Sequence, residues 1–127
     1  MLTEAELREV FKQPAVREVA CEVRGAPRLR VIPEVWRIQD TLAEIYPQVD
    51  EEQVPLSPNR LLQAYVFANP PLQRLIKVSQ ENFVVIFNRY TTFEDFKAEA
   101  LTRISDFSHE FDVGTYQRVG LRSLRSG

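Results

Sequence analysis

The chain has 127 residues, a formal net charge of −2, and 44% hydrophobic and 27% charged residues, which is the length and composition of one globular domain. The weakly acidic balance argues against a general nucleic-acid-binding role, because such proteins are usually strongly basic. No apolar run is long enough to span a bilayer, and the acidic N-terminus lacks the apolar core of a signal peptide, so we expect no membrane partner.

The first part of the chain predicts a strand and a helix. Residues 1–13 have apolar side chains at helical spacing and are expected to form an N-terminal arm or short helix. Residues 16–24 alternate with a period of two, which predicts a half-buried strand. Residues 33–46 repeat apolar side chains at the helical period, which predicts an amphipathic helix packed on a sheet.

The middle of the chain predicts three strands after a connection. Residues 48–59 are acidic and contain prolines, so we expect a connection without regular structure. Residues 61–67 are predicted as a strand, and residues 72–79 and 82–90 as a hairpin. Because its segment 83–87 is apolar on both faces, the second arm of that hairpin is expected in the centre of the sheet.

The last part of the chain predicts the clearest helix and a closing strand. Thr92 is the expected N-cap of a helix with phenylalanines at spacings of three and four, and Gly114 is expected to end it. Residues 116–124 then predict a strand. The whole pattern predicts a single α+β domain over residues 1–127. It has an antiparallel or mixed five-stranded sheet and two main helices on one face, in the order strand, helix, three strands, helix, strand.

Catalytic chemistry has no clear signature in this sequence. His109 is expected at the surface near the end of the second helix, where a positive charge is favoured. The single cysteine, Cys21, is expected to be a buried apolar residue, and one cysteine fits a reducing, cytoplasmic setting. An enzyme would need Glu18 and Glu22 to converge with His109 and an arginine, and no spacing requires this. We therefore assign no catalytic residue, no cofactor and no metal.

The arginines near the end of the chain form the one skewed charge distribution. Residues 113–127 contain no acidic residue, and Arg118 and Arg122 share one face of the predicted closing strand with Gly120. If this strand lies beside the first strand, Glu22 can pair with either arginine. We prefer this interpretation over an anion-binding or nucleic-acid-binding site, because the second helix is acidic.

Three short motifs suggest a family. The runs 14–19 (PAVREV), 88–90 (NRY) and 118–122 (RVGLR) resemble the N-terminal half of a sporadically distributed family of uncharacterised bacterial proteins. The resemblance covers most of the chain and implies no catalytic residue, because members generally lack an assigned activity. Family members usually continue into an aromatic-Ile-Asn run and a second half of similar size. The resemblance therefore implies either a shortened member or a truncated gene product.

Two functions are expected from these patterns. The first is a non-enzymatic domain that associates with itself or with a partner protein, because a doubly apolar strand and a closing strand both need coverage. The alternative is a small-ligand-binding module with a concave sheet face lined by aromatic side chains and an arginine as polar anchor. The expected ligand or interface residues are Arg89, Tyr90, Arg118, Arg122, Tyr65 and Phe67.

Overall fold

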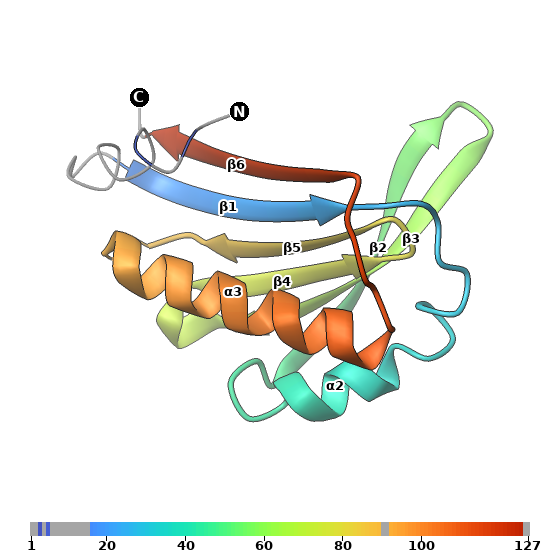
Figure 1. The fold of residues 1–127 in the computed structure, drawn as a ribbon, viewed down its shortest axis with the longest axis horizontal. Helices are drawn as coiled ribbons and strands as arrows, with labels where there is room; N and C mark the ends of the chain where they lie inside the picture. Colours follow the sequence, from blue (N-terminus) through green and yellow to red (C-terminus); the bar gives the residue numbers. More distant parts are fainter. Residues whose placement is uncertain (1–2, 4, 6–15, 90–91, 126–127) are drawn as a thin grey trace.

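The computed structural model describes residues 3, 5, 16–89 and 92–125. In this part of the chain, a six-stranded antiparallel sheet carries two α-helices on one face, which makes the fold α+β (Figure 1). The strand order is β2-β3-β4-β5-β1-β6. The elements are β1 (Val16–Arg24), α2 (Trp36–Leu42), β2 (Gln48–Ser57), β3 (Arg60–Asn69), the 3-10 turn η1 (Pro70–Leu72), β4 (Arg74–Ser79), β5 (Asn82–Phe87), α3 (Phe93–Glu110) and β6 (Arg118–Arg125).

The expected five-stranded sheet is wrong by one strand. The additional strand is β2, which we predicted as an irregular connection, so four strands lie between the two helices in sequence. It pairs with β3 from Gln48 opposite Ala68 to Ser57 opposite Arg60, with an irregularity between Pro55 and Ser57. Because β2 lies at the edge of the sheet, only one of its sides forms ladder hydrogen bonds, so proline and charged residues are tolerated.

The predicted central position of the doubly apolar strand is confirmed. β5 lies between β4 and β1, and all of its residues from Phe83 to Phe87 are buried. Phe83, Val85 and Phe87 pack in the main core beneath the helices. Val84 and Ile86 point to the opposite face, which we call the outer face, and form a small apolar cluster there with Ala20 of β1.

Local sequence signals explain most of the helix α3. The Thr92 hydroxyl accepts a hydrogen bond of 3.2 Å from the Asp95 backbone N–H, which confirms the predicted cap. The helix ends at Glu110 with Phe111 as its C-cap, and Asp112 then adopts a left-handed conformation with φ of 53°. The chain therefore turns two residues before Gly114, because aspartate tolerates this conformation better than most residues.

The closing strand occupies its predicted place beside the first strand. β6 pairs antiparallel with β1, with Glu22 opposite Gly120 and Arg24 opposite Arg118. β2 and β6 are therefore the two edges of the sheet formed by the described residues. Apart from Thr3 and Ala5, the expected N-terminal arm lies outside those residues. Neither of the described helices is both long and apolar enough to cross a membrane.

Candidate functional site

The aromatic residues proposed to line an open sheet face lie under the helices instead. Phe67 is 1% exposed within the core, and Tyr65 packs partly buried against the same core. The Phe83 ring stacks on Phe107 with centroids 4.7 Å apart, and the Phe87 ring contacts the edge of Phe96 at 5.2 Å. The aromatic face expected for a small ligand is therefore filled by α3.

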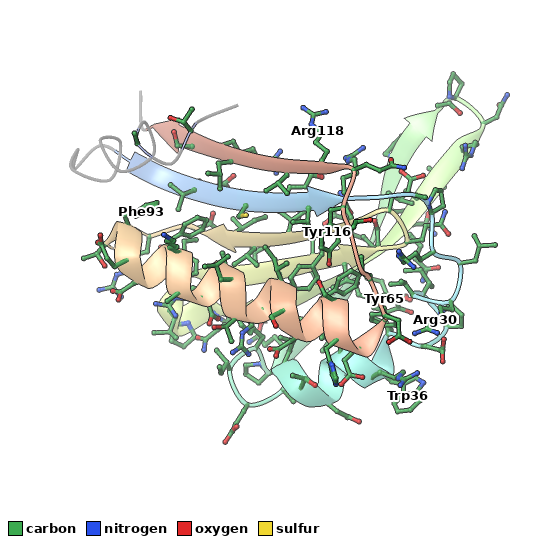
Figure 2. All side chains as sticks on the ribbon, viewed as in Figure 1. Arg30, Trp36, Tyr65, Phe93, Tyr116 and Arg118 are labelled. Atoms are coloured by element: carbon green, nitrogen blue, oxygen red, sulfur yellow. The ribbon has the colours of Figure 1, made fainter. Side chains whose placement is uncertain are left out.

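The predicted arginine sites do not form one cluster. Arg89 is exposed just beyond the end of β5, and Tyr90 lies outside the described residues. Arg118 and Arg122 lie on β6, both on the outer face of the sheet, as the alternation predicted. Figure 2 shows Arg118 projecting from β6 away from α3. Arg118 and Arg122 therefore lie together on the outer face, whereas Tyr65 and Phe67 lie on the helix side of the sheet.

The edge strand β6 presents a different surface on each of its two faces. Arg118 and Arg122 alternate along it with Val119 and Leu121, which point toward α3. Val119 is 52% exposed although it is apolar, and Leu121 is partly buried against the core. Along its other side β6 pairs with no strand among the described residues. Within the part of the chain that the structure describes, its outward backbone donors and acceptors therefore have no ladder partner.

An apolar groove runs between β6 and the N-terminal half of α3. Its volume is about 180 Å³, and its walls are formed by Cys21, Phe93, Phe96, Lys97, Ala100, Leu101, Val119 and Leu121. Leu101, on α3, is 59% exposed at the rim. Burial raises the pKa of the Cys21 thiol to about 11, so this side chain is neutral near pH 7 and acts as part of an apolar wall.

Glu22, on the outer face of β1, accepts hydrogen bonds from β1 and β5. Its carboxylate accepts hydrogen bonds from Asn82 at 2.7 Å and from Arg24 at 3.0 Å. Partial burial raises the pKa of Glu22, but these two hydrogen bonds and the charges of Arg24 and Arg122 outweigh it, so the pKa is lower than usual. Because Gly120 is directly opposite Glu22, Arg118 and Arg122 are its diagonal neighbours, and the charge of Arg122 acts on Glu22 while the ion pair of Glu22 is with Arg24.

The opposite edge of the sheet is acidic. Within β2, Asp50, Glu51 and Glu52 are consecutive, and no basic residue is present in the strand. Glu52 forms an ion pair of 3.3 Å with Lys77 on the outer face, while Glu51 accepts a hydrogen bond of 2.9 Å from Gln63. Sequence reasoning missed this edge because it assigned the three acids to a solvated turn. It also missed the groove. The available signal in the sequence is Leu101, an apolar residue of α3 that lies outside the buried apolar stripe of this helix.

Other titratable side chains lie on α3 or contact it. His109 is exposed near the end of α3 as predicted, and Asp106 pairs with Arg103 at 3.4 Å. Tyr46 donates a hydrogen bond of 2.5 Å to Glu99, and Arg103 pairs with Glu99 at 3.4 Å. Burial and the Glu99 carboxylate raise the pKa of Tyr46 far above its usual value. Within the described residues, no group of three or more His, Cys, Asp or Glu side chains is arranged to hold a metal ion.

Comparison of the chain with protein-family models, with curated proteins and with solved structures gave no match. The resemblance to the bacterial family therefore stays a prediction.

Proposed function

We propose that this protein acts by self-association through the β6 edge of its sheet. The observation that carries the proposal is the combination of an edge strand with an apolar groove directly beside it. A strand added to β6 forms main-chain hydrogen bonds with the edge, and an alternate apolar side chain of that strand enters the groove. The backbone edge of β6 thus supplies affinity for the added strand, and the groove supplies selectivity.

The composition of β6 supports this use of the edge. Proteins protect exposed edges with prolines, charges on both faces, bulges or covering loops. β6 contains no proline, and its arginines within residues 118–122 lie on the outer face only. The exposed Val119 on the other face adjoins the groove and is an apolar contact for a partner. β2, in contrast, has Pro55 and acids on both faces, while the pairing of each edge strand with its neighbour contains one irregularity.

The same proposal includes the setting of the protein. We place it in the cytoplasm of a bacterium, as a non-enzymatic domain that forms homo-oligomers. The single buried thiol, which has a raised pKa, is consistent with a reducing compartment. The bacterial origin depends on the family resemblance alone.

Light scattering coupled to size-exclusion chromatography tests the proposal. We expect the mass of the wild-type protein to rise with concentration from micromolar to submillimolar, and Val119→Glu to remain monomeric. Val119 is half-exposed, so a charge there disturbs the groove rim more than the folded chain. The matched control is Leu29→Glu, at a position that is 74% exposed in a distant loop, and it should associate like the wild type. A wild-type protein that stays monomeric at every concentration overturns the proposal.

A further inference from the structure

We infer that the strand added to β6 is β2 of a second copy, so that copies associate head to tail and extend one sheet. This inference rests on the proposed self-association through β6 and specifies its partner. The charges of the two edges, the direction of their strands and the register that they allow all favour this contact.

Charge complementarity distinguishes this contact from the symmetric one. β6 contains three arginines and no acid, whereas β2 contains three acids and no base. When β6 pairs with β6 of a second copy about a two-fold axis and the outer faces coincide, Arg118 and Arg122 lie opposite or diagonal to the same arginines of that copy, and like charges across a strand pair are destabilising. A contact of β6 with the second copy's β2 places arginines against carboxylates. Such electrostatic complementarity selects the partner and fixes the register.

Strand direction permits this contact without reorienting the copies. All neighbouring strands in the sheet are antiparallel, and the order begins with β2 and ends with β6. In a sheet of six alternating strands the two edges run in opposite directions. A second copy in the same orientation therefore presents its β2 antiparallel to β6, and the alternation continues across the contact.

One register pairs opposite charges on the outer face and one apolar pair on the helix side. With Arg118 opposite Glu52 of the second copy, Asp50 of that copy lies diagonally between Arg118 and Arg122 on the outer face. The same register puts the second copy's Val49 opposite Leu121 on the helix side, next to the groove, and its Glu51 opposite Val119. Val49 pairs with the inward-facing Phe67 and is 41% exposed, so it is available for this contact.

The prolines of β2 are compatible with this register. The paired segments are residues 118–122 of β6 and residues 48–52 of β2, so Pro47 and Pro55 both lie beyond them. No ladder hydrogen bond is therefore required from a residue without a backbone N–H. Because the two surfaces in the contact differ, it is heterologous and gives a ring or an open series of copies instead of a closed dimer.

Charge-reversed variants test the inference. Arg118→Glu is suitable because Arg118 is exposed and lies opposite Arg24 within the chain. The reversal replaces that repulsion by an attraction, although it also places a carboxylate diagonal to Glu22. Asp50→Lys is suitable because Asp50 is exposed at the other edge, opposite Val66. Each variant alone should self-associate about tenfold more weakly than the wild type. An equimolar mixture of the two should recover part of the association, because the introduced lysine lies diagonal to the introduced glutamate while Glu52 stays opposite it. The control Asp40→Lys, on the exposed side of α2, should behave like the wild type.

Sedimentation velocity over a concentration series separates the outcomes. Recovery in the mixture supports the inference. If Arg118→Glu associates more strongly than the wild type and Asp50→Lys is unchanged, the contact is the symmetric β6 pair, so the inference is overturned while self-association through β6 stands. If both variants associate like the wild type, the β2 contact is also overturned. A wild-type protein that is monomeric throughout overturns the proposed function itself. Thermal unfolding of every variant confirms that a loss of association is not a loss of fold.

Discussion

Replacing Glu22 by glutamine should destabilise the fold by about 1 kcal/mol near pH 7. Glu22 accepts hydrogen bonds from Asn82 at 2.7 Å and Arg24 at 3.0 Å, and hydrogen bonds to a charged group contribute about 1.5–3 kcal/mol when buried. The Glu22 side chain is 25% exposed and that of Arg24 is 47% exposed, so solvent screens part of this contribution. Glutamine also keeps an acceptor for Asn82, which reduces the loss further.

The assay for Glu22→Gln is urea unfolding of both proteins at several pH values. In a parallel thermal unfolding experiment, a loss of about 1 kcal/mol corresponds to a decrease in Tm of about 4 °C for a domain of this size. The folded-state pKa of Glu22 is lowered, so its stabilisation is fully present above the unfolded value of about 4.3 and is lost as the pH falls through the folded value. The deficit of the variant should therefore be complete near neutral pH and disappear in strong acid.

The matched control for this experiment is Glu18→Gln. Glu18 lies on the same face of β1, opposite Leu124, and forms no ion pair or hydrogen bond with a described residue. This substitution should change the free energy of unfolding by less than about 0.5 kcal/mol. A Glu22→Gln deficit that is equally large in strong acid, or an equal deficit for Glu18→Gln, would refute the reasoning.

Two further predictions concern buried groups in the core. Tyr46→Phe removes the hydroxyl that donates to Glu99 at 2.5 Å, and it should reduce the free energy of unfolding by about 2 kcal/mol in urea titrations. The control is Tyr65→Phe, which removes a hydroxyl at the sheet surface. It should change the free energy of unfolding by less than half as much. Because burial raises the pKa of Cys21 to about 11, a thiol-reactive disulfide reagent at about pH 8 should label the folded protein much more slowly than the urea-unfolded protein, and equal labelling rates would contradict this burial.

Much of the fold could be predicted because several segments have strong local patterns. The alternation in residues 16–24 matches β1 at both ends, and the capping signal at Thr92 matches the start of α3. The doubly apolar run 83–87 correctly indicated a central strand. In each case one local pattern, either a burial period or a capping residue, decides the structure without knowledge of the rest of the chain.

β2 could not be predicted from such a pattern. An edge strand with side chains exposed on both faces shows no burial alternation, and the residues of β2 with a described side chain are mostly exposed. Its three acids and Pro55 favour a loop by composition. The strand forms because β3 offers a full ladder of partners, which is a tertiary effect that overrides local preference.

The candidate site was predictable on one face only. The alternation of β6 correctly placed Arg118 and Arg122 on the same face. The face of the sheet that the helices cover could not be deduced from alternation, so Phe67 was expected on an open surface and lies in the core. The groove depends on α3 reaching Val119 and Leu121 across the sheet edge, and this contact has no local signature in the sequence.

The assignment of β2 as a strand also changes the meaning of the charge balance. In a flexible turn, Asp50 and its acidic neighbours are simply solvated, and a net charge of −2 then describes a weakly acidic protein. In an edge strand the same acids are fixed along one boundary of the sheet, while the arginines of β6 are fixed along the other. Opposite charges held at opposite edges of a rigid sheet favour like-oriented neighbours over inverted ones, because only the like-oriented arrangement brings the two signs together. The small net charge is therefore the sum of a basic edge and an acidic edge on opposite sides of the sheet. This separation of charge favours the proposed head-to-tail contact over a symmetric one.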